Sequence, residues 1–157
     1  MSVFQRLQQS AFTDWFLGSP SIWAYPTVLT LHTVGMAILV GASFVINLRV
    51  LQVSGLIPLH RLQPLYRLVW IGFAINLVSG VILFITEAAD RVVDPVFGIK
   101  MASILGALVL GAVVKRRAID RMDAPRAATL QTRSLAAAAL GMWTVAIVAG
   151  RLMAYFK

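Results

Sequence analysis

Four long apolar stretches dominate the pattern of hydrophobic and polar positions along the chain. They cover about residues 22–48, 68–86, 96–114 and 134–153, and charged residues lie close to their ends. A helix needs about 20 apolar residues to cross the roughly 30 Å hydrocarbon layer of a bilayer. The stretches lack the alternation that is typical of half-buried β-strands. The pattern therefore predicts four membrane-spanning helices.

A different pattern precedes the first stretch. Within residues 1–18, Phe4, Leu7, Ala11 and Trp15 recur at helical spacing, largely with polar residues between them. This spacing predicts one amphipathic helix that lies in the membrane interface, with Trp15 near the lipid headgroups. The alternative is an ordered arm that packs on a partner. The segment does not have the layout of a cleavable signal peptide.

The composition agrees with a membrane protein. Of the 157 residues, 59% are hydrophobic and 13% are charged, and the mean hydropathy is +0.83. Soluble domains have about 45–50% apolar and about 25% charged residues, so this chain is not a free soluble globule. The chain contains no Cys, which excludes disulfides, thiol catalysis and thiolate metal sites.

The basic charge is distributed unevenly between the two sides that four spans would create. The two loops after the first and third stretches, with their flanks, hold nine Lys or Arg against two Asp, a balance of +7. The opposite side holds five Lys or Arg against four acidic residues, a balance of +1. Because excess Lys and Arg mark cytoplasmic loops, we expect a bacterial inner-membrane protein with both termini on the periplasmic side. The net charge of +8 then indicates topology, and no nucleic-acid partner is expected.

His32 is the main chemical exception within the apolar stretches, where an ionisable side chain indicates a functional site. Arg49 marks the end of the first stretch, and the helix between them places His32 about 25 Å away. Met36 follows His32 by four residues and shares its helix face. The pair predicts either copper ligation by His32 and Met36 or ligation of a haem iron by His32.

A second haem ligand would have to come from another helix, because axial ligands approach the porphyrin from opposite faces. His60 is predicted on the far side of the membrane from His32. Met142 or Met101 could pair with His32, or a second copy of the chain could supply the ligand. The alternative without a cofactor is that His32 hydrogen-bonds a neighbouring helix, at the level of Thr33 or Ser79, and that the methionines fill gaps in the packing.

Three other polar side chains fall within the spans. Asn76, near mid-membrane, is predicted to join helices through hydrogen bonds, and Asn47 is predicted to be a second polar packing residue. Lys100, near the start of the third span, can extend to the surface or pair with an acidic residue of the preceding loop. The sequence shows no paired-carboxylate site, no nucleophile beside a base and no phosphate-cradling glycine loop. We therefore do not expect an enzyme.

The order of several short motifs resembles a family of small uncharacterised bacterial four-span membrane proteins. The motifs lie within residues 20–117 and include Trp23-Ala24-Tyr25-Pro26, Leu31-His32-Thr33-Val34-Gly35, Gly72-Phe73, Ser79-Gly80 and Asp94-Pro95-Val96-Phe97-Gly98-Ile99-Lys100. In that family, a His in the first span and a Phe-x-x-Lys segment recur, and His32, Phe97 and Lys100 match them. The chain also has a looser similarity to copper-resistance-type membrane proteins and small b-type cytochromes.

The chain departs from that family at two positions. Asn47 replaces the acidic residue that usually precedes the Leu-Arg pair, and a basic run, Lys115-Arg116-Arg117, replaces a His that often closes the third span. If the missing His ligates a cofactor in relatives, this chain has lost or replaced that ligand.

These observations predict one all-α membrane domain over residues 1–157, a four-helix bundle with an N-terminal interfacial helix. The expected function is a non-catalytic accessory or anchor subunit of a larger inner-membrane complex, such as an electron-transfer complex. Its partners would be the lipid bilayer and other membrane subunits or copies of itself. The alternatives are a haem-b- or copper-binding protein that uses His32, with Met36 or Met142 as helpers, and a small-solute permease that works as an oligomer.

Overall fold

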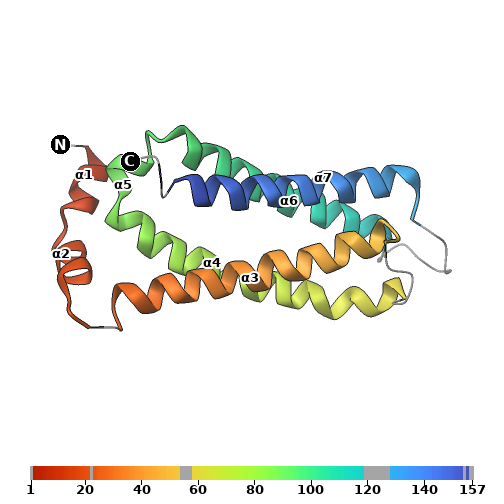
Figure 1. The fold of residues 1–157 in the computed structure, drawn as a ribbon, viewed down its shortest axis with the longest axis horizontal. Coiled ribbons are helices and arrows are strands. Elements are labelled where there is room, and N and C mark those ends of the chain that lie inside the picture. Colours follow the sequence, from red (N-terminus) through yellow and green to blue (C-terminus); the bar gives the residue numbers. More distant parts are fainter. Residues whose placement is uncertain (1, 22, 54–57, 119–127, 154, 156–157) are drawn as a thin grey trace.

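A computed structural model describes the chain over residues 2–21, 23–53, 58–118, 128–153 and 155. The described residues form helices (Figure 1), which are α1 (Val3–Gln8), α2 (Ala11–Gly18), α3 (Tyr25–Val50), the 3-10 helix η1 (Leu59–Leu62), α4 (Gln63–Thr86), α5 (Ala88–Arg91), α6 (Pro95–Ala118) and α7 (Leu130–Leu152).

The helices α3, α4, α6 and α7 are the four expected spans. They contain 23 to 26 residues each and are long and apolar enough to cross a membrane. At 1.5 Å per residue these helices measure roughly 35–39 Å, which exceeds the roughly 30 Å hydrocarbon layer. The helix ends therefore reach the headgroup region. At the end of α6, Lys115, Arg116 and Arg117 occupy the last turn, where cations interact favourably with the helix dipole.

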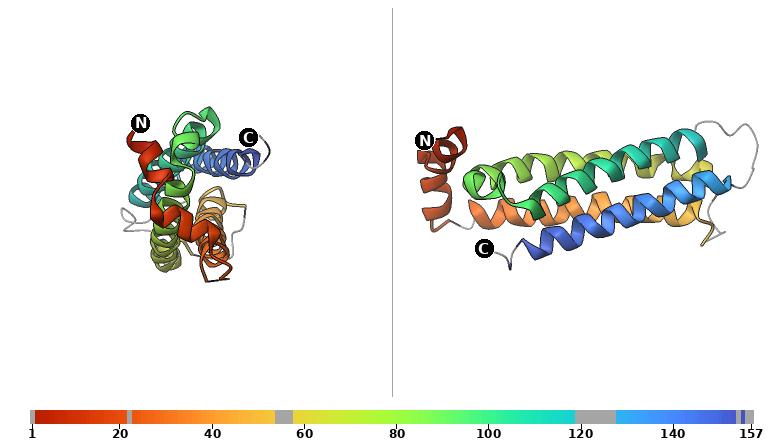
Figure 2. Two further views of the ribbon diagram at one scale, coloured as in Figure 1. Left: turned by 90° about the vertical axis from the view of Figure 1, so that its left-hand side faces the viewer. Right: turned by 90° about the horizontal axis from the view of Figure 1, so that it is seen from above.

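The spans pack as two antiparallel hairpins, α3 with α4 and α6 with α7 (Figures 1 and 2). Between the hairpins, α3 and α7 make the most extensive contact. The buried core here includes Leu39 and Ile46 from α3, Val69 from α4, Ala107 from α6 and Trp143 from α7. Small side chains such as Ala107 let the helices approach closely, which is how membrane helices commonly associate.

The N-terminal segment forms two short helices where the sequence predicted one. Ser10 ends the regular pattern because its hydroxyl caps α2 by accepting a hydrogen bond from the backbone N–H of Thr13 at 3.3 Å. Serine is a strong N-cap residue, and here this local bond starts a new helix. Both helices lie across the end of the bundle (Figure 2). Trp15 on α2 is 63% exposed, as expected for a side chain at the membrane interface.

The first helix is tied to its own chain through Gln8. The Gln8 side chain donates to a carboxylate oxygen of Asp90 at 2.9 Å and accepts from the backbone N–H of Ala89 at 2.8 Å. The ring of Phe4 also packs edge-on against the ring of Phe84, with 6.4 Å between centroids. The N-terminal arm thus packs on the bundle through α1 and α5.

The bundle has two distinct ends. We call the end with α1, α2, α5 and the last turn of α7 the terminal end (Figure 1). The opposite end, which carries Arg49, Arg67, Lys115, Arg116 and Arg117, is called the basic end. Residues 119–127, which contribute to the predicted basic charge, and the side chain of His60 lie outside the described part of the chain.

The orientation of the bundle can be tested with single thiols, because the natural chain contains no Cys. Val93→Cys places an exposed thiol at the terminal end, and Gln131→Cys places one at the basic end. With a membrane-impermeant maleimide on intact bacterial spheroplasts, we expect labelling of the Val93 variant alone, because a Lys- and Arg-rich end stays in the cytoplasm. Permeabilised cells should label both variants, and the unmodified chain controls for background. Labelling of only the Gln131 variant in intact cells would reverse the topology.

Candidate functional site

A cavity of about 420 Å³ lies between the two hairpins near the terminal end. A volume of this order is typical of small-molecule and cofactor sites, at about 300–1,000 Å³. Its wall is largely apolar and includes three phenylalanines, Phe73, Phe84 and Phe97. Three basic side chains, His32, Arg91 and Lys100, line the same cavity. We call this space the His32 cavity.

The His32 ring is held by a hydrogen bond to the neighbouring helix α4. Its Nδ1 atom lies 3.0 Å from the hydroxyl oxygen of Ser79. The same hydroxyl lies 2.7 Å from the backbone carbonyl oxygen of Ile75, to which it can donate its hydrogen. In that arrangement the hydroxyl oxygen accepts from Nδ1 of His32, and Nε2 keeps its lone pair. Among the described residues, Nε2 has no hydrogen-bond partner.

The helix α4 is shaped to fit this ring. The side-chain amide of Asn76 donates to the backbone carbonyl of His32 at 2.9 Å, which joins α3 to α4 at the level of the site. A Cβ added to Gly80 would lie 3.1 Å from Cε1 of His32. The imidazole therefore packs directly on the backbone of α4, where a larger residue would displace it.

Arg91 is neutralised by carboxylates from the same turn. Its guanidinium donates to Glu87 at 2.7 Å through Nε and pairs with Asp94 at 3.5 Å through Nη1. Gln8 holds Asp90, the other acidic residue of this turn.

Lys100 lines the same cavity, but among the described residues its charged group is not paired as that of Arg91 is. The sequence predicted that it would extend to the surface or pair with an acidic residue of the preceding loop. Within the described part of the chain, Lys100 forms no ion pair. Its aliphatic stem instead runs past Gly150 of α7, where an added Cβ would lie 3.7 Å from Cε. Lys100 therefore gives the cavity a positive charge that no described carboxylate offsets.

The structure places only some of the methionines that the sequence connected with His32 in the lining of the His32 cavity. Met101 and Met153 line the His32 cavity. Met36 and Met142 do not belong to its lining. Met142 instead packs on α6, where a Cβ added to Gly106 would lie 3.1 Å from its sulfur atom. Within the described residues, no group of three or more His, Cys, Asp or Glu side chains converges as a metal site.

Sequence reasoning did not identify Arg91 or Met153 as cavity residues. The spacing of Arg91 from Glu87 and Asp94, at four and three residues, is a local signal for the observed ion pairs. Met153 carries no comparable signal, because it reaches the cavity only through the packing of the second hairpin against the first. Asn47, the remaining polar residue, lies near the basic end and belongs to another pocket.

Comparison with known proteins does not identify a family for this four-span chain. It matches no protein-family model, no curated protein and no solved structure.

Proposed function

We propose that this chain is a haem-b-binding, non-catalytic subunit of a membrane electron-transfer complex. The observation that carries the proposal is the position of His32, whose Nδ1 lies 3.0 Å from the Ser79 hydroxyl while Nε2 has no described partner. Haem irons are commonly ligated by one imidazole nitrogen while the other donates a hydrogen bond that fixes the ring.

The composition of the cavity wall supports this ligand class. The rings of Phe84 and Phe97 stack with 5.4 Å between centroids and an interplanar angle of 21°, which offers flat apolar surfaces suited to a porphyrin. Haem b also carries two propionate groups. The Lys100 ammonium offers a charge partner for a propionate, because a half-buried cation is costly unless an anion accompanies it.

A second iron ligand is available from the other hairpin. Met101 lies on α6 and lines the same cavity as His32 on α3. Ligands on different helices can approach a porphyrin from opposite faces, as His32 and Met36 on one helix cannot. We therefore assign Met101, and not Met142, as the candidate thioether ligand.

The subunit role follows from what a buried haem can do in a protein of this size. A haem accepts and passes on single electrons, so the chain would exchange them with a partner. The spans leave much of their apolar surface exposed, which suits contact with lipid and with other membrane subunits. Copper binding by His32 and Met36 is less supported, because Met36 is absent from the cavity lining.

Haem titration of the purified full-length chain in mild detergent tests this proposal. We expect saturation at one haem per chain, with a Soret band and a sharp α band after reduction, because a fixed imidazole ligates the iron. Iron and copper analysis of protein purified from cells supplies the second readout. A colourless preparation that also fails to bind added haem would contradict the proposal, and bound copper without haem would favour the copper alternative.

A further inference from the structure

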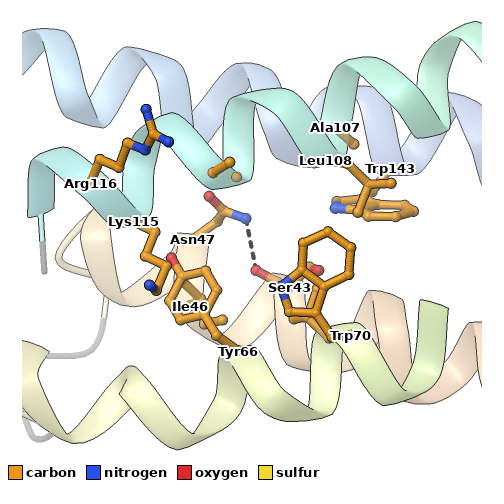
Figure 3. A pocket seen from close by; sticks show the side chains of 13 residues that line it. Ser43, Ile46, Asn47, Tyr66, Trp70, Ala107, Leu108, Lys115, Arg116 and Trp143 are labelled. Carbon is orange, nitrogen blue, oxygen red and sulfur yellow. Dashed lines mark hydrogen bonds between the residues drawn. The ribbon is translucent and has the colours of Figure 1, made fainter. Parts of the chain in front are cut away.

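A second pocket of about 220 Å³ lies at the basic end of the bundle (Figure 3). All four spans contribute to its wall, and it shares no lining residue with the His32 cavity. It combines a buried amide, Asn47, with aromatic side chains and two cations, Lys115 and Arg116. We call it the basic-end pocket.

The amide of Asn47 is oriented by the backbone of its own helix. Its nitrogen donates to the carbonyl oxygen of Ser43 at 2.8 Å (Figure 3), so the side-chain oxygen points the other way, toward α6. The Ser43 hydroxyl does not donate to this oxygen, because that hydroxyl donates to the backbone carbonyl of Leu39 at 2.7 Å.

The oxygen of this amide is left without a donor. Asn47 is only 3% exposed, and its Oδ1 has no hydrogen-bond partner among the described residues. Buried acceptors of this kind are costly and rare, and such an atom calls for a donor from outside the chain. The pocket is therefore built to receive a group that carries an O–H or N–H.

The charge of the pocket selects for an anion. Lys115 and Arg116 project from the last turn of α6, and the Lys115 ammonium lies 5.6 Å from the centroid of the Tyr66 ring. With its loops and flanks, this end holds nine Lys or Arg against two Asp in the sequence, so its net charge is positive. A ligand with a phosphate would be attracted here.

The position of the pocket favours a membrane lipid over a soluble anion. Trp70 lines it and is 59% exposed, and tryptophans of membrane proteins gather at the level of the headgroups. The headgroup of a lipid would enter the pocket beside Trp70, and its acyl chains would lie in the surrounding bilayer.

We propose that the basic-end pocket binds phosphatidylglycerol. Lys115 and Arg116 would hold the phosphate, and a hydroxyl of the headgroup glycerol would donate to Oδ1 of Asn47. Phosphatidylmethanol carries the same singly charged phosphodiester but no headgroup hydroxyl, and phosphatidylcholine has neither a net negative charge nor a donor. This inference rests on the basic-end pocket alone and does not depend on haem binding.

Native mass spectrometry of the full-length chain in detergent, with phosphatidylglycerol, phosphatidylmethanol and phosphatidylcholine of matched acyl chains, tests the proposal. We expect phosphatidylglycerol to bind about fivefold more tightly than phosphatidylmethanol, the ratio that corresponds to one net hydrogen bond. Phosphatidylcholine should bind most weakly. Glycerol phosphate without acyl chains distinguishes a lipid site from a site for the free anion, and we expect no adduct with it.

Three variants separate the roles of the residues. Asn47→Leu should still bind both anionic lipids but should no longer prefer phosphatidylglycerol over phosphatidylmethanol. The double variant Lys115→Gln and Arg116→Gln should weaken both anionic lipids about tenfold or more. Arg117→Gln removes a charge from the same helix turn but not from the pocket lining, and its lipid binding should stay within twofold of the natural chain.

Two results would overturn the proposal. One is equal binding of phosphatidylglycerol and phosphatidylmethanol by the natural chain. This lipid panel needs no substitution, so it decides the question even if Asn47→Leu fails to fold. The other is a loss of binding in Arg117→Gln as large as half that of the double variant, which would indicate a diffuse charge effect instead of a site.

Discussion

Replacement of His32 with alanine is expected to abolish the Soret and α bands of the haem-loaded protein. In the proposed haem site the imidazole would supply the iron ligand, and α3 offers no other nitrogen ligand in the His32 cavity. Haem bound per chain should fall below about a tenth of the natural value, since an axial ligand is lost outright. Absorption spectra of protein purified in parallel from the same cells measure the change.

Two further substitutions test whether the loss of the haem bands comes from the loss of an iron ligand. Ser79→Ala removes the group that fixes the ring, and we expect haem affinity to fall about 10- to 100-fold, as is usual for partners that orient a metal ligand. His60→Ala, which removes the other histidine, should leave the bands intact. Full bands in the His32 variant, or their loss in the His60 variant, would assign the iron to a different residue.

Replacement of Gly72 with leucine is expected to separate α3 from α4. A Cβ at this position would lie 2.6 Å from the backbone nitrogen of Leu39 and 2.9 Å from the backbone oxygen of Gly35. Both contacts are with backbone, so no side chain can rotate away and the helices themselves must move. Overpacking of this kind costs about 1–3 kcal/mol and occasionally more. Loss of helical circular dichroism during titration with a denaturing detergent measures the change.

Gly41 provides the matched control for this substitution. It lies on the same helix as Gly35, yet a Cβ built there meets nothing within 4 Å. Gly41→Leu adds the same bulk on the exposed face of α3 and should unfold at nearly the same detergent concentration as the natural chain. Equal stability of the Gly72 and Gly41 variants would show that the close approach of the hairpin helices does not limit stability.

The four spans could be predicted from the sequence because the thickness of the bilayer fixes how many apolar residues a helix needs. The short N-terminal helices were predicted as one, because helical spacing continues across residues 1–18 while a single capping bond at Ser10 interrupts it. Such a bond depends on one hydroxyl and leaves the hydrophobic pattern unchanged. The two ends of the bundle followed from the order of the spans and the loops between them.

The site could be predicted only in part. His32 was found because an imidazole is rare within a span, and Ser79 was identified as a possible partner from its depth in the next span. The choice between Met101 and Met142 could not be made, since spans in lipid are apolar on every face and the pattern does not show which face meets a neighbour. Arg91 was missed because its place depends on how a short turn folds back over the cavity.

The arrangement as two hairpins has a consequence for how the protein is assembled. Each hairpin is formed by spans that are neighbours in the chain, so each can be completed in the membrane before the two meet. The His32 cavity exists only where they meet, with His32 on one hairpin and Lys100 and Met101 on the other. A ligand that fills the cavity would contact both hairpins and would therefore stabilise their association. Binding of that ligand and the final step of assembly are then linked by mass action.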